Sequence, residues 1–445
     1  MSAIAEISAG EQEFALPQVE QMHILVSLGY NVENSNLGSF YHSVTSNLLS
    51  RPNWMLKHAG VKSSSSNTSP SSLPVGVIKK KTSPNKSSSN KVSINGRFHV
   101  FLAEAQAIGM PYDLLANYRS IYPDALKPIT NFNRGFQVIC KKMSMLLTLR
   151  SYVLNNNLDM TDDIQLPDSY YYSTVKTDEN ERLMLIAAFE KQQSADIAHN
   201  LWVVKPSDAC KGHGIMIFND LNQLLSFFDD VTNKSVAFLI QRYISNPLLL
   251  PNGNRKFDIR IWVLYVSTEY TVYYYKNGVC RTASCSYDSN DLSNKYSHLC
   301  NHCIAAEHPN YGKYEGEPTN EIFFDNFNKI LHAISNGAVD LDMHIIPQIT
   351  SIICHVFRAG HDMMASGPSD DYDSFMLFGF DFMIDSSYKV WLLEVNSSPA
   401  VADALLDNVT RDLIDIAVIG KLSNGEVADQ TNNGFIKIMD VNNCA

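Results

Sequence analysis

The segment that most restricts the fold of this chain is FGFDFMIDSSYKVWLLEVNSSPA, residues 378–400. Two apolar runs flank a polar stretch, which predicts a buried β-hairpin. Glu394 and Asn396 are two residues apart and therefore share a face of their strand. If the turn pairs Asp385 with Tyr388, Asp381 lies diagonal to Glu394 on that same face, opposite Leu392. The hairpin would then gather three polar side chains on one surface.

Such a cluster needs a neutralising partner. Two carboxylates in an apolar setting repel each other and cost several kcal/mol of desolvation each. Oxygen ligands of this kind favour Mg²⁺, which keeps water ligands and accepts phosphate oxygens. The sequence therefore predicts Asp381, Glu394 and Asn396 as magnesium ligands. The alternative is a carboxylate pair that caps loops at a sheet edge.

Composition places the chain among globular proteins. Its 445 residues are 45% hydrophobic and 18% charged, enough for two or three packed domains. There is no run of eighteen apolar residues and no secretion-type N-terminus, so we expect a cytosolic protein without a membrane anchor. The eight dispersed cysteines favour reduced thiols. A net charge of −11 argues against nonspecific nucleic-acid binding.

The N-terminal part predicts a small α/β unit. Residues 21–30 have the pattern of a strand entering a turn, and residues 36–57 alternate with roughly helical spacing. Residues 63–90 are rich in Ser, Pro and Lys and predict a disordered insert, in which three successive lysines form an ordinary solvated cluster. A packed pattern resumes at residue 97.

The rest of the chain alternates strands and helices. Strands are predicted at 201–205, 214–218, 237–244, 256–266 and 270–284, the last turning at 276–278. Helices are predicted at 221–231, 320–334 and 342–364. This order indicates an α/β (α+β) fold.

Cationic side chains follow several of these strands. Lys205 ends one strand, and Lys211 begins the turn Lys211-Gly212-His213-Gly214, where flexible backbone and ammonium groups can close over phosphates. The pattern does not match the GxxxxGK[ST] phosphate loop. An ordinary glycine turn with exposed lysines is the alternative.

The strand RKFDIRIWVLYV strengthens the phosphate interpretation. Lys256, Asp258 and Arg260 alternate with apolar residues, so the three charges share one face, which fits a ligand cleft or a solvated surface. Arg281 could add a guanidinium with bidentate geometry for a carboxylate or phosphate. In FLIQRYI, Gln241 and Tyr243 could receive an adenine edge, although a plain core strand would look the same.

The segment HLCNHC, residues 298–303, offers four potential zinc ligands within six residues. Structural zinc sites normally draw ligand pairs from two separated segments, so we favour an ordinary segment here. No base that could activate a catalytic cysteine is identifiable.

In this order, KGHGI, NPLLLPNGNRKFDIRIWVL, GVCRTAS, HLCNHCI, NYGKYE, FGFDFMID and VWLLEVNSSPA closely resemble the tubulin-tyrosine ligase family of the ATP-grasp superfamily. The likeness is strongest over residues 201–418. A weaker likeness includes NFNRGFQVICKKMS, where Lys142 stands at the upstream nucleotide-binding lysine of the family, and RFHVFLAE.

The resemblance implies an ATP-grasp fold with four parts. A smaller N-terminal domain (1–139), with the insert at about 61–93, would dock on tubulin. A central domain (140–243) and a catalytic domain (244–422) would form the ATP-grasp core, followed by a tail (423–445). A monomer is expected, bound to soluble tubulin in the cytoplasm.

Carried over residue by residue, the resemblance also implies roles. Mg²⁺ would lie on the three hairpin residues, Arg260 and Arg281 would face the reacting carboxylate and the incoming amino acid, and Glu394 would count among the catalytic groups. K⁺ is a further ion that the family allows. The residues implied for ATP binding are Lys142, Lys205, Lys211, Gln241, Tyr243, Lys256 and Asp258.

The implied reaction joins L-tyrosine to the C-terminal glutamate of detyrosinated α-tubulin through an acyl phosphate, giving ADP and phosphate. Lysines, arginines and Mg²⁺ would supply most of the catalysis by stabilising phosphate charge. The chain has no long basic extension after the catalytic core, which favours tyrosine over glutamate or glycine. Two features depart from the family: Ser397-Ser398 replaces Gly-Ala, and Cys300 replaces a usual Thr. Alternatives are a ligase that adds glutamate or glycine and a non-catalytic tubulin-binding protein.

Overall fold

The computed structural model describes residues 22–26, 40–58, 60–61, 92–93, 97–103, 112–175, 178–196, 199–209, 212–230, 236–267, 270–364, 371–422 and 432–440. The predicted insert at about 61–93 lies outside these residues, apart from two short strands at its ends. These are β3 (Gly60–Val61) and β4 (Val92–Ser93), which pair with each other. Lys211 also lies outside the described residues.

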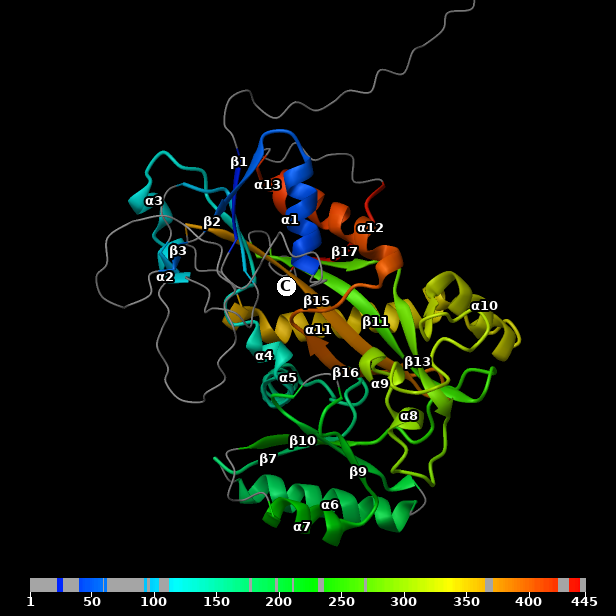
Figure 1. Ribbon diagram of the computed structural model, residues 1–445. Coiled ribbons are helices and arrows are strands. Elements are labelled where there is room, and N and C mark those ends of the chain that lie inside the picture. Colours follow the sequence, from blue (N-terminus) through cyan, green and yellow to red (C-terminus); the bar gives the residue numbers. More distant parts are fainter. Residues whose placement is uncertain are drawn as a thin grey trace, which may run out of the picture.

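Eleven of the described strands form one large sheet (Figure 1). Its main path runs in the order β14 (Glu321–Phe323), β13 (Val279–Ser286), β11 (Arg255–Val266), β15 (Asp373–Ile384), β6 (Ile129–Asn131), β5 (Val100–Leu102), β1 (Met22–Val26) and β2 (Trp54–His58). Three further strands extend it: β12 (Thr271–Tyr275) pairs with β11, β16 (Val390–Asn396) with β15, and β17 (Phe435–Asp440) with β12.

The two halves of this sheet differ in strand direction. From β2 to β15 all neighbours along the path are parallel, whereas β11 pairs antiparallel with β12, β13 and β15. Residues from both halves share one hydrophobic core, which includes Ile24 and Leu102 as well as Phe378 and Val409. The N-terminal strands are therefore continuous with the strands that carry the candidate site.

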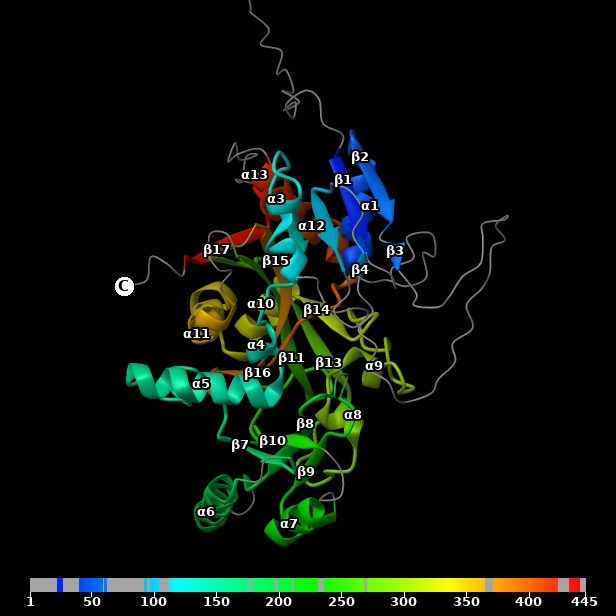
Figure 2. The same ribbon diagram turned by 90° about the vertical axis from the view of Figure 1, so that its left-hand side faces the viewer.

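Helices cover this sheet. Figure 2 shows α11 (Ile346–Met364) beside the strands, and Figure 1 shows α10 (Phe324–Ile334) beyond one end of α11. A second helical layer is made by α1 (Phe40–Ser50), which packs against α12 (Asp403–Ile414). Coverage by helices explains why all twelve residues of β11 are buried, although three of them are charged on one face.

The smaller sheet lies at the bottom of Figure 1. Its strands β7 (Ser169–Ser173), β10 (Ala237–Arg242), β8 (Trp202–Pro206) and β9 (Met216–Phe218) are antiparallel throughout. Helices α6 (Glu179–Ala195) and α7 (Leu221–Asp230) pack on it around a separate core that contains Phe189, Trp202 and Phe228. The strands and the helix predicted between residues 201 and 231 are present.

A further long helix is α5 (Lys142–Asn156). The other helical elements are short: α2 (Tyr112–Leu115), α3 (Tyr118–Ile121), α4 (Gln137–Cys140), α8 (Lys295–His298), α9 (His302–Ala305), α13 (Gly420–Leu422) and π-helical turns at Leu341–Ile345 and Asp415–Ile419. Within the described ranges, no helix combines the length and the apolar character needed to cross a membrane.

One sequence expectation for strands was wrong. Residues 276–278 do not reverse the chain, because β12 and β13 both run antiparallel to β11, along successive parts of it. The chain keeps the same direction through β12 and β13, so the segment between them interrupts the strand pairing and is not a hairpin turn. The expected tail after residue 422 also contains an ordered strand, β17, whose pairing with β12 adds it to the large sheet.

The interruption at residues 276–278 depends on the small size of Gly278. A Cβ atom at this position would lie 2.3 Å from Phe324 Cζ and 2.8 Å from the Arg260 carbonyl oxygen. We expect Gly278→Ala to lower the unfolding free energy by about 1–3 kcal/mol, because the backbone oxygen cannot easily move away. Denaturant titration checks this, with Asn277→Ala as the control in the same segment. Equal midpoints for Gly278→Ala and the wild type would contradict the prediction.

Candidate active site

A cleft of about 860 Å³ opens between the two sheets. Strands β8 and β10 of the smaller sheet line one side, and β11, β13, β15 and β16 of the large sheet line the other. The start of α5 and residues 298–301 complete the wall.

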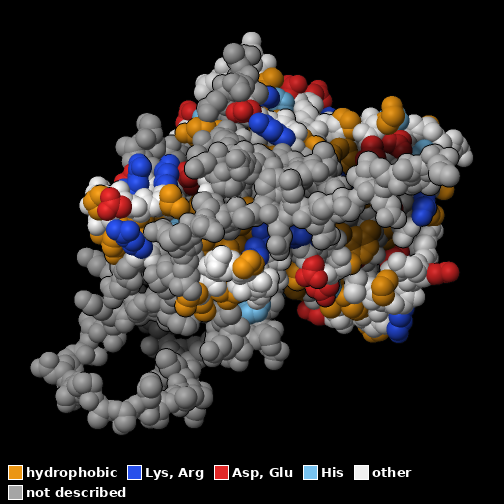
Figure 3. Space-filling view, turned by 90° about the horizontal axis from the view of Figure 1, so that it is seen from above, with side chains coloured by type: hydrophobic (Ala, Val, Ile, Leu, Met, Phe, Trp, Pro, Cys, Tyr) orange, Lys and Arg blue, Asp and Glu red, His pale blue; other side chains and the backbone are white. Residues whose placement is uncertain are grey.

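The cleft gathers positive charge. Its lining includes five basic and three acidic side chains, whereas the whole chain carries −11. On the face seen from above, acidic and basic side chains are interspersed over the described part (Figure 3). A concave site with excess positive charge favours an anionic ligand. The charged lining residues are Lys142, Lys205, Arg242, Lys256, Arg281, Asp258, Asp381 and Glu394.

The predicted hairpin is present as β15 and β16, but its predicted register is wrong. The Asp385 N–H donates to the carbonyl of Lys389, and Asp381 lies directly opposite Glu394 instead of Leu392. Leu393 is an extra residue in β16, because Leu392 pairs with Phe382 and Glu394 pairs with Asp381. A β-bulge of this kind shifts the alternation of side chains by one residue. The bulge therefore turns Glu394 toward the face of Asp381.

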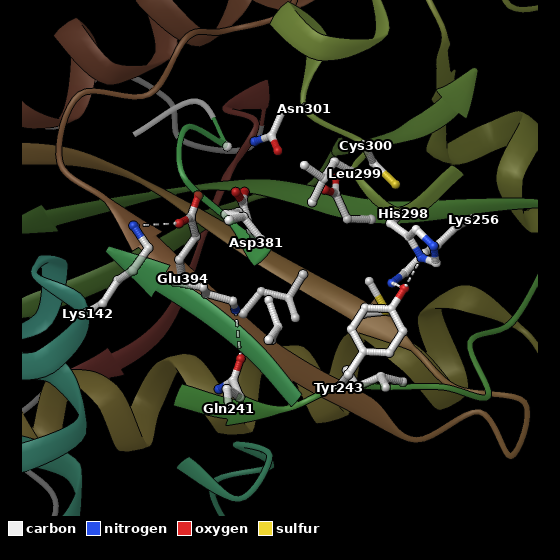
Figure 4. A pocket seen from close by; sticks show the side chains of 18 of the residues that line it. Lys142, Gln241, Tyr243, Lys256, His298, Leu299, Cys300, Asn301, Asp381 and Glu394 are labelled. Atoms are coloured by element: carbon white, nitrogen blue, oxygen red, sulfur yellow. Dashed lines mark hydrogen bonds and ion pairs between the residues drawn. The ribbon is translucent and has the colours of Figure 1, made fainter. Parts of the chain in front are cut away.

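The three predicted magnesium ligands are brought together by this arrangement. Asn396 Nδ2 donates to Asp381 Oδ2 and to Glu394 Oε1, at 3.2 Å each. Asp381 is buried, whereas the side chain of Glu394 is 25% exposed to the cleft. Figure 4 shows Glu394 beside Lys142 at one end of the pocket, with Tyr243, Lys256 and His298 toward the other.

A buried network of charges fixes Asp381. Arg260 donates to both of its oxygens through Nε and Nη2, and Arg281 Nη2 lies 2.9 Å from Oδ2. Arg281 also donates to Asp258, its cross-strand neighbour, at 2.6 and 2.9 Å. Arg281 therefore bridges two buried carboxylates. The two arginines outweigh the effect of burial and hold the pKa of Asp381 well below its usual range. Burial raises the pKa of Asp258 despite Arg281.

Two lysines line the cleft, Lys205, which is half-buried, and Lys256, which is buried. Lys205 Nζ donates to Gln241 Oε1 at 2.7 Å, and Lys256 Nζ donates to the Tyr243 hydroxyl at 2.8 Å. Within the described part of the chain, neither ammonium group forms an ion pair with a carboxylate. Burial lowers the pKa of each lysine to about 8. A buried cation with no anion beside it is expensive unless a ligand supplies the charge.

Lys142 approaches the acidic cluster from the start of α5. Its Nζ donates to the carbonyl of Ala209 at 2.9 Å and lies 3.4 Å from Glu394 Oε2. The segment after β8 is shaped by Gly212 and Gly214, whose φ angles of +75° and +71° favour glycine. A Cβ on Gly212 would also lie 2.5 Å from a methyl carbon of Ile304 in α9.

The oxygen atoms of the acidic cluster fit Mg²⁺. Among the described residues, Asp381 Oδ2 accepts from Arg260, Arg281 and Asn396, whereas Oδ1 accepts from Arg260 alone. Each oxygen of Glu394 has one contact. A carboxylate has about four lone-pair sites, so capacity remains on both groups. Asn396 would present its oxygen after a flip of the amide.

Mg²⁺ is usually bound by one or two carboxylates together with phosphate and water. The described residues contain no cluster of three or more His, Cys, Asp or Glu side chains that could hold a metal by themselves. The remaining ligands of an ion at Asp381 and Glu394 would therefore come from a bound phosphate and from water.

The segment 298–303 contributes single residues to different surroundings. His298 Nδ1 contacts the Tyr243 hydroxyl at 2.7 Å, and its Nε2 contacts the carbonyl of Asp291 at 2.9 Å. Cys300 lines the cleft, and burial raises the pKa of its thiol to about 12. Cys303 is exposed. These contacts occupy both ring nitrogens of His298.

Two of the predicted nucleotide contacts are already engaged within the protein. Gln241 is buried, and its amide contacts Lys205 on one side and Ser169 Oγ on the other. The Tyr243 hydroxyl contacts Lys256 and His298. Sequence reasoning did not find Ser169, which is distant in the chain from the motifs, and considered His298 only as a metal ligand.

A model of the Tubulin-tyrosine ligase family matches residues 133–425, which is more than half of the chain and contains every charged residue of the cleft lining. This chain belongs to the tubulin-tyrosine ligase family. Membership in the tubulin-tyrosine ligase family implies the ATP-grasp fold, and the two sheets with a cleft between them have the arrangement expected of it.

Similar proteins carry the names of different tubulin-modifying enzymes. "Tubulin glycylase 3C" of Tetrahymena thermophila is 31% identical over 227 residues, which cover 49% of this chain and 20% of the relative. "Probable tubulin polyglutamylase TTLL2" of Homo sapiens is 32% identical over 256 residues, 55% of this chain and 40% of the relative. "Tubulin glycylase 3A" of Drosophila melanogaster is 34% identical over 217 residues, 47% and 20% respectively.

The chain thus spans well under half of the length of these relatives. Their names point to glycine and glutamate, and they give no support to tyrosine as the amino acid. Chain size does not favour tyrosine over glutamate or glycine, because relatives of much greater length match the same core.

Proposed function

We propose that this protein is an ATP-dependent ligase that joins glutamate or glycine to a carboxylate of tubulin. The observation that carries the proposal is the arrangement, in one cleft, of Lys205 and Lys256, which form no ion pair among the described residues, and of the facing carboxylates Asp381 and Glu394, whose oxygens keep bonding capacity. A triphosphate with Mg²⁺ complements both groups at once, because phosphate oxygens satisfy the lysines while the ion satisfies the carboxylates.

The apolar part of the cleft suits the base of the nucleotide. Val203, Ile215, Leu299 and Met383 line it, and flat apolar walls with few polar groups are typical of such pockets. The phosphates would then extend toward Lys205, Lys256 and Lys142. With Gln241 and Tyr243 engaged internally, we assign their side chains a supporting role and not a direct contact with adenine.

In the proposed reaction a carboxylate oxygen of tubulin attacks the γ-phosphorus, the bond to ADP breaks, and an acyl phosphate forms. The amine of the incoming amino acid then attacks the acyl carbon, phosphate leaves, and the amine loses a proton. Bound Mg²⁺ would neutralise phosphate charge. Lys142, Lys205 and Lys256 hold phosphate oxygens, and Arg260 and Arg281 keep Asp381 ionised and aimed at the ion.

The choice of amino acid is tested by incubating the purified protein with tubulin, ATP and Mg²⁺ and with labelled glutamate, glycine or tyrosine separately. We expect ATP-dependent incorporation of glutamate or glycine into tubulin. Incorporation of tyrosine alone would contradict the proposal and indicate a ligase that adds tyrosine to tubulin. ATP binding without incorporation of any of the three would favour a non-catalytic tubulin-binding protein.

The pKa values of the two lysines predict a pH dependence. In the free protein both ammonium groups lose protons as the pH rises through about 8, and the neutral amine no longer attracts phosphate. We therefore expect the affinity for ATP to fall between pH 7 and pH 9.5, while bound phosphate holds the lysines protonated in the complex. Titration calorimetry across this range measures the effect. Constant affinity up to pH 9.5 would contradict it.

A further inference from the structure

Lys205 and Lys256 are each held by a chain of uncharged groups. Lys205 Nζ donates to Gln241 Oε1, and Gln241 Nε2 in turn donates to Ser169 Oγ at 2.9 Å. The Ser169 hydroxyl then donates to the carbonyl of Pro167 at 2.6 Å. Gln241 and Ser169 are directly opposite residues on the neighbouring strands β10 and β7. The direction of every hydrogen bond follows from the ammonium group, which can only donate.

The second chain begins at Lys256 and has the same design. In the neutral form of the His298 ring, Nε2 carries the proton and donates to the carbonyl of Asp291, 2.9 Å away, because a carbonyl can only accept; Nδ1 is then an acceptor. The Tyr243 hydroxyl, 2.7 Å from Nδ1, therefore donates to His298 and accepts from Lys256 Nζ. This chain also ends on a backbone carbonyl.

Aromatic faces add to the second chain. The Lys256 ammonium lies 4.1 Å from the centre of the Tyr243 ring and 5.7 Å from that of Tyr287. Both tyrosine rings make edge contacts with His298. Cation–π contact stabilises a cation without placing a negative charge beside it.

We propose that Ser169 and His298 are positioning residues that fix the ammonium groups of Lys205 and Lys256, through Gln241 and Tyr243, for the phosphates of ATP. Uncharged relays orient the lysines and leave their charge uncompensated, whereas a carboxylate in either place would compete with the ligand for the ammonium group. The inference rests on the proposed use of ATP and adds two residues to that site.

Matched pairs of variants test each relay by ATP binding. Ser169→Ala removes the hydroxyl, whereas Ser169→Thr keeps it. His298→Leu removes the acceptor for Tyr243, whereas His298→Asn keeps an oxygen near the place of Nδ1. We expect Ser169→Ala and His298→Leu to weaken ATP binding by about fivefold to tenfold each, and the conservative partners by less than about threefold.

The decisive experiment repeats these substitutions in proteins that already carry Lys205→Met or Lys256→Met. If the relays act through the lysines, Ser169→Ala has no further effect on ATP affinity in Lys205→Met, and His298→Leu has none in Lys256→Met. Thermal unfolding is followed for every variant, and His298→Asn remains informative if His298→Leu does not fold.

Other results would overturn the inference. Unchanged ATP affinity in Ser169→Ala and His298→Leu would exclude a positioning role, and so would an equal loss in the Lys→Met backgrounds. Failure of the wild-type protein to bind ATP is a separate outcome, which removes the proposed function and this inference with it.

Discussion

Replacing Glu394 by Gln is expected to lower the rate of ligation by about a thousandfold while leaving the fold intact. The substitution keeps the volume and removes one of the two charges available to Mg²⁺, and the loss of about 4 kcal/mol of transition-state stabilisation corresponds to that factor. The side chain is 25% exposed and accepts from Asn396, and Lys142, which loses its carboxylate partner, keeps its hydrogen bond to the carbonyl of Ala209.

The measurement is turnover with labelled amino acid at increasing Mg²⁺, together with thermal unfolding. Glu190→Gln, an exposed change on α6, is the control and is expected to retain full activity. A Mg²⁺ requirement that moves to higher concentration in Glu394→Gln would support direct ligation. Undiminished turnover at every Mg²⁺ concentration would refute the metal role.

Arg281→Met is expected to lower the free energy of unfolding by about 3–5 kcal/mol and to abolish ligation. Arg281 is buried and pairs with both Asp258 and Asp381. Without it, Asp258 keeps no hydrogen-bonding partner for its carboxylate among the described residues. Removing one partner of a buried ion pair typically lowers the free energy of unfolding by about 3–5 kcal/mol, because the other charge is left unpaired. Denaturant titration at neutral pH measures the loss.

A second substitution separates stability from chemistry. Arg281→Met combined with Asp258→Leu removes the whole pair, which is often close to neutral when the replacements pack well. We expect most of the stability to return and ligation to remain absent, because Asp381 has lost one of its two arginines. If the single variant unfolds at the wild-type denaturant midpoint, the bridging role of Arg281 is wrong.

The pH dependence of stability provides a further test of Arg281→Met. Burial raises the pKa of Asp258 even in the intact protein, and loss of Arg281 would raise it further. A carboxyl whose folded pKa is raised destabilises the protein as the pH rises above its unfolded pKa. The defect of Arg281→Met should therefore shrink as the pH falls toward the usual pKa of Asp.

Hydrophobic periodicity within short segments predicts much of the fold and of the site. The alternation in 256–261 places Lys256, Asp258 and Arg260 on one face. In β11, Lys256 and Asp258 line the cleft, and Arg260 pairs with Asp381 beside it. The apolar spacing of residues 342–364 predicts a helix, and α11 occupies it after one π-helical turn. These features depend on side chains a few residues apart, which periodicity reports directly.

Features that depend on partners distant in the chain were not predictable. The pairing of β6 with β15 joins Ile129 to Asp373, and no local pattern specifies it. The same holds for Ser169, which becomes important only because β7 lies beside β10. The preference for tyrosine rested on chain length, which says nothing about the shape of a substrate pocket, and the names of the relatives do not support it.

The extra residue Leu393 has a consequence for comparing related chains. Leu393 has no partner in β15, whereas its two neighbours lie opposite Phe382 and Asp381. Removing it would leave a regular ladder in which Glu394 still lies directly opposite Asp381, on the same face. A related chain with a gap at this position would therefore keep the acidic pair, so the spacing along the hairpin can differ by one residue between chains that share the same facing carboxylates.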